Sequence, residues 1–514
     1  MQANNHTIPS AHVNRSAILI SMLAAASYFT WWLQPQHIGV PLLFALLFIG
    51  EVYHVLMALF FWRTIWPKSE IITKTKLKRI SSTTPVDIFI TVCGEPLEIV
   101  SETILAAKKM AWKGHQIYLL NDSRVANKAN WQEYEHLSSQ HQIQCITRTT
   151  PGGAKAGNIN HALSLTNSPY VVIFDADMVP AVDFLKKTMP YFADAKVGFV
   201  QTPQYYKNAD QNEVAAGAWE QQKLFFGPIM RGKNGDNASF ICGTNVVISR
   251  KALVEVGGMC EDNIAEDFIT SFLIHEKGWR SVYVPEVLAR GLAPEDLLSY
   301  FKQQLRWARG SLEVLFRFNP AVRRGLSFWQ KIHYASSALY YLNGLTVLID
   351  MSMPLIYLFT GLEPVKGTTT RFAFFFLPFM GMTLYILYRS TDYSVTLRAM
   401  SFSMSSWTLQ LIALWSVLTN KKMGFSVTPK QAQTGNFLHL AYPHLGYIIL
   451  TIIASIYAYF RTGFSPSYVT NLAWAFFNIM MFIPFISSAY PWSHLVSKFK
   501  KPQHYLAIFR RTQL

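Results

Sequence analysis

The 514-residue chain is 51% hydrophobic, is rich in Phe, Tyr and Trp, and has a formal net charge of +16. Only 15% of its residues are charged, whereas soluble domains carry about 25%. This composition excludes an ordinary soluble domain and indicates a protein embedded in a lipid bilayer. Many Lys and Arg residues flank apolar runs, as on the cytoplasmic side of membrane proteins. No recognised binding motif accompanies them, so nucleic-acid binding is disfavoured.

The chain has four cysteines, and all of them fall in its central polar region. They form no C-x-x-C pair and no Cys/His cluster with zinc spacing. We expect the central region to be cytosolic, where thiols stay reduced. The sequence therefore predicts neither disulfides nor a zinc site at Cys93, Cys145, Cys242 and Cys260.

Apolar runs that approach the roughly 20 residues of a spanning helix occur at both ends of the chain. The first run ends in Trp31 and Trp32 without a small-residue cleavage site, so we interpret it as an anchor that remains. Two spans are predicted before the central region and four after it. They are Ser16–Leu33, Gly39–Trp62, Ile332–Phe359, Phe372–Arg389, Leu438–Tyr459 and Leu472–Tyr490.

Between Thr83 and Asn319 the pattern changes to short β-rich runs that alternate with helical stretches. Such alternation predicts an α/β fold with a mainly parallel sheet covered on both faces. The predicted strands are Asp87–Val92, Gln116–Leu120, Tyr170–Phe174, Gly198–Gln201 and Ser281–Val284.

The apolar stretch Ser403–Leu418 is ambiguous because polar residues interrupt it. The interruptions favour an amphipathic helix in the membrane interface. In that case the following Lys421–Lys430 loop faces the same side of the membrane as the central region. A spanning helix, the alternative, would place the loop on the outside.

Two acids follow the predicted strand Tyr170–Phe174 directly. In open α/β sheets, ligands bind outside the carboxyl ends of the strands, and alternate residues of an extended chain face the same way. Asp175 and Asp177 are therefore candidate ligands of Mg²⁺ or Mn²⁺, hard cations that neutralise a diphosphate. A polar turn after a strand explains D-x-D equally well when it is taken alone.

Three further motifs are each ambiguous in isolation. Asp87 and Asp122 stand at the edges of predicted strands, where acids bind a base or ribose or simply begin a turn. The glycine-rich segment 151–160 can bring Lys155 to a phosphate, but it is not a Walker A sequence, and a plain surface loop is as good an explanation. Asp267 precedes a helical stretch, where it serves either as a general base for a hydroxyl proton or as a helix cap.

Gln303, Arg306 and Trp307 share one face of a predicted helix over Leu297–Phe318. An arginine can bind a diphosphate, and a tryptophan can stack on a sugar ring. By spacing alone, an amphipathic surface helix is the better explanation. The later hexamer Phe425–Lys430 offers a hydroxyl and a cation on a short loop, which says little alone.

Taken together and in order, these motifs resemble the family 2 processive glycosyltransferases, and among them the bacterial cellulose synthase catalytic subunits. The ordered acids followed by Q-x-x-R-W are specific for that enzyme class, and F-x-V-T-x-K is more specific for its cellulose-synthase-like members. The resemblance implies a cytosolic GT-A-like domain, which binds a nucleotide sugar, inserted between transmembrane helices. The implied domains are residues 1–82, 83–320 and 321–514, with a gating loop at 421–435.

The resemblance also implies roles for individual residues. Asp267 is the implied general base, and Asp175 and Asp177 lie at the metal and diphosphate. The implied donor-binding residues are Asp87, Glu95, Asp122, Lys155, Asp175, Asp177, Gln303 and Arg306. The implied acceptor-binding residues are Trp307, Cys242, Gly243 and Thr244. The implied gating-loop residues, which close over the donor, are Phe425, Val427, Thr428 and Lys430.

The function that the resemblance implies is inverting, processive polymerisation of UDP-glucose into a β-glucan, with Mg²⁺ or Mn²⁺. The catalytic domain would be cytoplasmic, the chain would lie in the inner membrane, and the polymer would cross that membrane. The family pattern leaves room for a periplasmic export subunit. About two dozen residues follow the last predicted span, so no PilZ domain is expected.

Departures from the family pattern leave the product open. Ala265 replaces the Thr of T-E-D, Cys93-Gly94 replaces Y-N before Glu95-Pro96, and Asn121 and Ser123 flank the second acid. A β-1,3 linkage, or UDP-N-acetylglucosamine as donor in the manner of chitin and hyaluronan synthases, stays an alternative. The non-enzyme alternative is an inactive scaffold or a transporter. It is disfavoured because the acids are all present and the spans hold few ionisable residues.

Overall fold

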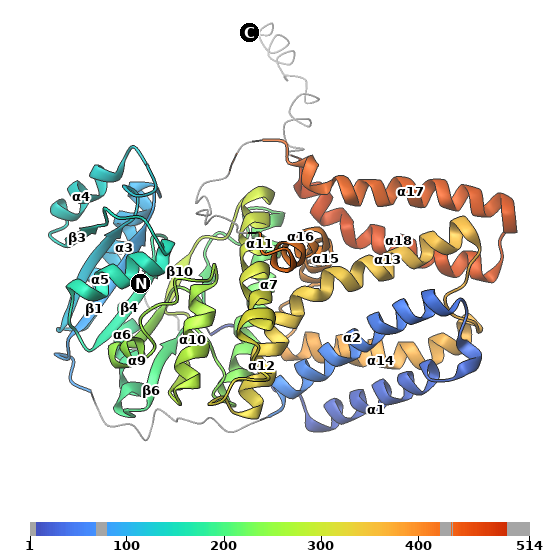
Figure 1. The fold of residues 1–514 in the computed structure, drawn as a ribbon, viewed down its shortest axis with the longest axis horizontal. Helices are drawn as coiled ribbons and strands as arrows, with labels where there is room; N and C mark the ends of the chain where they lie inside the picture. The colour runs from blue at the N-terminus through green and yellow to red at the C-terminus, as the bar shows by residue number, and fades with distance from the viewer. Residues whose placement is uncertain (1–6, 68–79, 422–432, 434, 491–514) are drawn as a thin grey trace, which may run out of the picture.

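The computed structural model describes residues 7–67, 80–421, 433 and 435–490 (Figure 1). An α/β domain, on the left of Figure 1, stands at one end of a bundle of long helices, on the right. Helices α7, α11, α15 and α16 lie between these two regions.

The α/β domain is built on a seven-stranded sheet in the order β3-β2-β1-β4-β8-β6-β9. Only β8 runs antiparallel to its neighbours β4 and β6, so the sheet is mainly parallel as predicted. Its strands are β1 (Val86–Val92), β2 (His115–Asn121), β3 (Gln144–Thr147), β4 (Tyr170–Asp175), β6 (Val197–Gln201), β8 (Val246–Ser249) and β9 (Arg280–Tyr283). A second sheet contains β5 (Val179–Pro180), β10 (Ala289–Gly291) and β7 (Tyr205–Tyr206).

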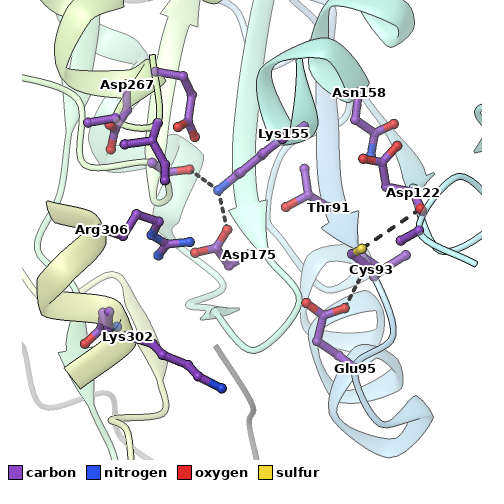
Figure 2. A pocket seen from close by; sticks show the side chains of 18 of the residues that line it. Thr91, Cys93, Glu95, Asp122, Lys155, Asn158, Asp175, Asp267, Lys302 and Arg306 are labelled. Atoms are coloured by element: carbon purple, nitrogen blue, oxygen red, sulfur yellow. Dashed lines mark hydrogen bonds and ion pairs between the residues drawn. The ribbon is translucent and has the colours of Figure 1, made fainter. Parts of the chain in front are cut away.

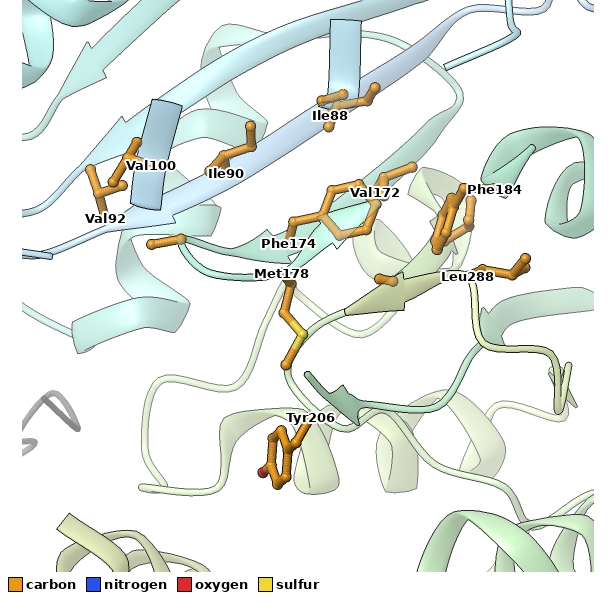
Figure 3. Close-up of a cluster of buried hydrophobic side chains, with 14 of the residues drawn as sticks. Ile88, Ile90, Val92, Val100, Val172, Phe174, Met178, Phe184, Tyr206 and Leu288 are labelled. Atoms are coloured by element: carbon orange, nitrogen blue, oxygen red, sulfur yellow. The ribbon is translucent and has the colours of Figure 1, made fainter. Parts of the chain in front are cut away.

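Both faces of the central sheet are buried, which explains its nearly continuous apolar strands. Along β1, Ile88 and Ile90 point to one face, toward the Val100 side chain of α3 (Figure 3). Phe89 points to the other face and packs with Ile159 of α5. Side chains of a strand alternate between faces, so a strand covered on both sides needs apolar residues at successive positions.

Helices cover this sheet and lead to the membrane region. Those of the domain and its border are α3 (Leu97–Lys108), α4 (Trp131–Gln140), α5 (Ala154–Leu165), α6 (Phe184–Thr188), α7 (Glu213–Leu224), α8 (Met230–Asn234), α9 (Arg250–Glu255), α10 (Glu266–Glu276) and α11 (Leu297–Glu313). A π-helical turn, Val314–Phe318, extends α11.

Five helical segments are long and apolar enough to cross a membrane, as judged over the described part of the chain. They are α2 (Pro41–Ile65), the run Phe328–Thr360 that contains α12 (Phe328–Leu339) and α13 (Asn343–Thr360), α14 (Thr369–Ser390), α17 (Leu438–Thr462) and α18 (Pro466–Ser488). The predicted first span forms α1 (Arg15–Trp32), which is not among these five. It shares an apolar cluster with α2 and α14, and the rings of Tyr28 and Phe379 stack between α1 and α14.

The chain before α1 contacts both the α/β domain and the end of α14. Thr7 pairs with Glu286 of that domain, and the Ala11 N–H donates to the Ser390 carbonyl at the end of α14. The start of the described chain and the end of α14 therefore lie together on the side of the α/β domain.

The ambiguous stretch 403–418 is not one continuous span. It lies within α15 (Leu397–Ser405) and α16 (Trp407–Leu418), which meet at Ser406. At about 1.5 Å per residue, α16 extends only about 18 Å, which is less than the roughly 30 Å of a hydrocarbon core. Figure 1 shows both helices crosswise to the bundle at its border with the α/β domain, the arrangement predicted for an interface helix.

Candidate active site

A cavity of about 710 Å³ lies at the carboxyl end of the central sheet. Its walls come from the ends of β1, β2, β3 and β4, from the start of α5, from the loop before β8, and from α10 and α11. The carboxyl edge of a mainly parallel sheet is where α/β proteins bind ligands. The cavity therefore marks the candidate active site.

Asp122 and Arg148 form the most enclosed ion pair of the cavity. Arg148 Nε and Nη2 donate to the two carboxylate oxygens of Asp122, each at 2.8 Å. Burial raises the pKa of Asp122, and the arginine opposes that rise. Arg148 also binds the carbonyls of Gly152 and Ala154, so it ties the glycine-rich loop to the end of β2.

Lys155 joins three elements at the centre of the cavity. Its ammonium group pairs with the Asp175 carboxylate and donates to the Gly243 carbonyl at 2.7 Å (Figure 2). Because Lys155 lies in the first turn of α5, the glycine-rich segment does lead into a helix, as predicted. The helix N-terminus and the ammonium group together make this part of the cavity suitable for an anion.

Asp177 and Thr244 support the cavity from beneath. Among the described residues, those that line the cavity include Asp175 but not Asp177 or Thr244. Asp177 is 1% exposed, and its Oδ2 accepts from the Leu292 N–H at 2.8 Å. Thr244 is fully buried, and its hydroxyl accepts from the Asp175 N–H. Thr244 thus supports Asp175 rather than facing an acceptor, which corrects its predicted role.

The position of Asp87 contradicts its predicted role in donor binding, because Asp87 lies at the opposite end of the sheet from the cavity. It is the second residue of β1, whereas the cavity meets β1 at its last residues, Thr91 and Val92. Asp87 is 1% exposed and binds Arg250 at 2.9 Å and the Ser168 hydroxyl at 2.6 Å. It holds β1 to the start of α9, and its placement excludes direct contact with a ligand in the cavity.

The right half of Figure 2 holds Glu95, Asn158 and Asp122. Glu95 accepts from the Cys93 N–H at 2.6 Å, which fixes the chain after β1. Asn158 donates to the Leu120 carbonyl at 3.0 Å and presents its amide to the cavity beside Asp122. These neutral and acidic groups suit hydrogen bonds from a base or a ribose.

Asp267 lies at the start of α10, on the other side of the cavity. Its Oδ1 accepts from the Phe268 N–H at 2.8 Å, and a Cβ atom at Gly243 would lie 3.1 Å from its Oδ2. Gly243 has φ +77°, so both its conformation and the close carboxylate favour glycine. Burial raises the pKa of Asp267, which brings the carboxylate closer to the basicity of a general base.

Helix α11 brings Gln303, Arg306 and Trp307 to the cavity, as their spacing predicts. Asp296 caps this helix by accepting from the Ser299 N–H at 2.8 Å. In Figure 2 the Arg306 side chain extends toward the part of the cavity that contains Lys155 and Asp175. Three cations, Lys155, Arg306 and the unpredicted Lys302, therefore stand in the same half of the cavity.

A second cavity of about 550 Å³ continues from the first into the helical bundle. The two cavities share five lining residues, which are Gln204, Cys242, Ala265, Asp267 and Trp307. The second cavity is lined further on by aromatic and hydroxyl side chains, including Phe60, Phe225, Tyr340, Tyr341 and Ser403. Asp267 and Trp307 thus stand at the junction between the sheet edge and a passage toward the membrane.

The predicted gating-loop residues Phe425, Val427, Thr428 and Lys430 lie outside the described residues, so their role stays a prediction. Gln433, just beyond them, does line the first cavity. Its N–H donates to Asp296, the cap of α11, at 3.1 Å.

Arg148, Asn158 and Lys302 were missed by the sequence analysis. Arg148 follows β3, a strand whose short and partly exposed sequence gave no periodic signal. Asn158 and Lys302 lie one turn from predicted site residues on α5 and α11. Their helical spacing from Lys155 and Arg306 was the signal that could have identified them.

Two family models match the part of the chain that forms the cavity. Residues 85–310 match the family model described as glycosyltransferase like family 2, and residues 254–391 match the model described as cellulose synthase. Residues 85–310 are thus similar to a family 2 glycosyltransferase domain. That domain contains every predicted site residue from Asp87 to Trp307, and the cellulose synthase match continues from it into the bundle.

The chain is similar to curated proteins over only part of their length. The cellulose synthase catalytic subunit [UDP-forming] of Xanthomonas axonopodis pv. citri (strain 306) is 34% identical over 65% of this chain and 47% of its own length. The subunit of the same name from Pseudomonas fluorescens (strain SBW25) is 28% identical over 92% of this chain and 66% of its own. The chain therefore spans less than two thirds of these relatives.

A solved structure confirms the GT-A-like fold. The mannosyltransferase PcManGT from Pyrobaculum calidifontis, in complex with GDP-Man and Mn²⁺, superposes with a TM-score of 0.52. Its sequence is 18% identical, and the match covers 74% of this chain and all of that one. The fold class predicted from the alternation of strands and helices is thus confirmed, with spanning helices on both sides of the domain.

Proposed function

We propose that this protein is an inverting, processive glycosyltransferase that builds a β-glucan from UDP-glucose and passes the chain into the membrane. The observation that carries this proposal is the junction of the two cavities at Asp267 and Trp307. A donor bound at the sheet edge would meet an acceptor emerging from the bundle at this point. The names of the relatives, cellulose synthase catalytic subunits [UDP-forming], support this substrate.

The donor would lie along the first cavity. Its uracil and ribose would occupy the half with Asp122, Asn158 and Glu95, which offers hydrogen-bond acceptors and amides. Its diphosphate would lie in the half with Lys155, Lys302 and Arg306, because cations there compensate phosphate charge. Binding would draw the Lys155 ammonium away from Asp175 toward the phosphates.

The transfer would be a single displacement. The hydroxyl of the acceptor sugar, stacked on Trp307, gives its proton to the Asp267 carboxylate as its oxygen bonds to the anomeric carbon. The bond from that carbon to the phosphate oxygen breaks on the opposite side, and UDP leaves. Attack from one face and departure from the other inverts the anomeric centre, so an α-linked donor yields a β-linked product.

The end of β4 fits a divalent cation that is shared with the donor. Among the described residues, no three His, Cys, Asp or Glu side chains gather as a metal site. A Mg²⁺ ion held together with substrate phosphates needs only one or two protein carboxylates. Asp175, which faces the cavity, would hold Mg²⁺ or Mn²⁺, which neutralises the departing diphosphate when bound, whereas Asp177, the second predicted ligand, lies behind it and outside the cavity wall.

We propose a cellular arrangement that agrees with the topology. The α/β domain would be cytoplasmic, where nucleotide sugars are available, and the bundle would cross the inner membrane. The polymer would leave through the second cavity, whose aromatic and hydroxyl side chains suit a sliding sugar chain. A periplasmic export subunit would receive the polymer on the far side.

The test supplies purified protein in lipid nanodiscs with labelled UDP-glucose and Mg²⁺ or Mn²⁺. Insoluble label that a β-1,4-glucanase digests is the expected product. Digestion only by a β-1,3-glucanase would reassign the linkage, and incorporation only from UDP-N-acetylglucosamine would reassign the donor. Absence of UDP release from either donor would overturn the proposal.

A further inference from the structure

Asn263 and Glu313 connect the turn before Asp267 to helix α11. Asn263 Nδ2 donates to Glu313 Oε2 at 2.6 Å, and Asn263 Oδ1 accepts from the Ala265 N–H at 2.7 Å. The two residues are 7% and 3% exposed, and neither lines either cavity. Their contacts therefore act on the site from behind.

A buried ion pair extends this connection to the membrane border. Glu313 Oε1 lies 3.2 Å from Arg309 Nη2, and Arg309 Nε donates to the Ser416 hydroxyl of α16 at 3.2 Å. Arg309 is only 5% exposed. A buried carboxylate is tolerated when its oxygens are satisfied by an opposite charge and hydrogen bonds. Glu313 is satisfied by Arg309 on its own helix and by Asn263 from the turn.

The backbones of the turn and of α11 touch directly. A Cβ atom at Gly310 would lie 2.4 Å from Ala265 Cβ and 2.9 Å from Ala265 N. Any side chain at position 310 would push the turn away from the helix. Glycine is thus required by the close approach, and the hydrogen bonds of Asn263 hold the two elements at this distance.

We propose that Asn263 and Glu313 are positioning residues, which fix Asp267 relative to Arg306 and Trp307. This inference rests on the proposed function. Asp267 follows Asn263 by four residues, and Trp307 precedes Glu313 by six residues, which is about 9 Å along the helix. The contact between Asn263 and Glu313 therefore sets the spacing between the general base and the groups that hold diphosphate and acceptor.

The test compares sugar transfer with hydrolysis of the donor in the purified full-length protein. In Asn263→Ala, polymer formation should fall roughly 10- to 100-fold, because a misplacement of about 1 Å can cost that much. The KM for UDP-glucose should change little, since the donor contacts remain. The ratio of hydrolysis to transfer should rise, because water can replace a misaligned acceptor. An unchanged ratio with an unchanged kcat would overturn the inference.

Asn208→Ala is the matched control. Asn208 is 5% exposed, accepts from the Ala293 N–H at 2.7 Å, and donates to Glu295 Oε1 at 2.9 Å. It makes the same kinds of bonds as Asn263, but to the loop before α11. Both variants should lose similar thermal stability, whereas only Asn263→Ala should raise the hydrolysis ratio. Equal ratios of donor hydrolysis to sugar transfer in the two variants would show that Asn263 only stabilises the fold.

An exchange of the amide and the carboxylate supplies a rescue. Asn263→Asp alone places two carboxylates in contact and should abolish transfer. Adding Glu313→Gln lets the glutamine amide donate to the new carboxylate, so transfer should recover relative to the single variant. A double variant no better than the single one would contradict the inference.

Hydrogen exchange separates this inference from the proposed function. The Ala265 N–H donates a hydrogen bond to Asn263 Oδ1. Its amide hydrogen should therefore exchange with solvent faster in Asn263→Ala than in Asn208→Ala. If the wild type released no UDP from UDP-glucose, the proposed function would fail while this result could still support the structural connection. Equal exchange rates would overturn the connection itself.

Discussion

The α/β domain and the helical bundle use their charged side chains in different ways. In the domain, Arg148 and Asp122 share two 2.8 Å contacts, with side chains only 8% and 12% exposed. In the bundle, His54 of α2 and Asp350 of α13 share a single 2.8 Å contact, with side chains 37% and 32% exposed. A bidentate pair is stronger and more specific in its geometry than a single contact. Enclosed charged side chains therefore hold the candidate active site in its geometry, whereas packing between apolar and aromatic side chains holds the bundle together.

The largest effect is expected where an enclosed charge performs the reaction. Asp267→Asn keeps the shape of the side chain and removes its basicity, so kcat should fall roughly 10²- to 10⁴-fold. Label incorporation from UDP-glucose measures the loss. Asp262→Asn, an exposed acid in the same turn, is the control and should keep the wild-type rate. Wild-type kcat in Asp267→Asn would exclude Asp267 as the base.

Breaking the enclosed pair should cost more stability than breaking the pair in the bundle. Arg148→Met leaves Asp122 buried without its partner, which typically costs about 3–5 kcal/mol. Chemical unfolding in detergent, followed by tryptophan fluorescence, measures the change. Adding Asp122→Asn should recover part of the loss because no buried charge remains. A loss below about 1 kcal/mol would place this pair with ordinary surface ion pairs.

Asp350→Asn should have a smaller effect on stability. Polar contacts between membrane helices contribute about 0.6 kcal/mol on average and at most about 1.7 kcal/mol. Unfolding under the same conditions as for Arg148→Met makes the two regions directly comparable. The proposed difference between the regions would break down if Asp350→Asn destabilised the protein as much as Arg148→Met.

A separate effect should appear in the pH dependence of stability, at Glu266. Burial, with Asp267 nearby as a lesser cause, raises the pKa of Glu266 from 4.5 to about 7. The protonated carboxyl is therefore favoured in the folded state. The stability that this protonated carboxyl contributes to the folded state is complete below about pH 4.5 and is lost as the pH rises toward 7. Glu266→Gln should raise the Tm relative to wild type at pH 8 and change it little at pH 4.5. Equal changes in Tm at pH 4.5 and at pH 8 would contradict the raised pKa of Glu266.

Much of the fold could be predicted because local patterns carry it. The five predicted strands lie within about one residue of β1, β2, β4, β6 and β9. Their apolar runs are unambiguous, since both faces of the sheet are buried. β3 and β8 were missed. β3 is short and only partly buried, and β8 begins directly after a loop that sequence reasoning assigned to the acceptor.

Some of the site could be predicted and some could not. Glu95, Asp122, Lys155, Asp175, Asp267, Gln303, Arg306 and Trp307 do line one cavity with Cys242 and Gly243. Arg148 was not predicted because its only signal is a contact with Asp122, 26 residues earlier in the chain. Side-chain partners so far apart cannot be recognised from spacing.

Local sequence patterns were enough to predict the kinds of element, five of the six predicted spans and most of the side chains that line the cavity. Which of the acids lie together in the cavity depends on the pairing of the strands. Asp87 and Asp175 lie on neighbouring parallel strands, but one stands near the start of β1 and the other at the end of β4. Parallel strands bring like ends together, so a few positions along a strand separate a structural acid from one that faces the ligand.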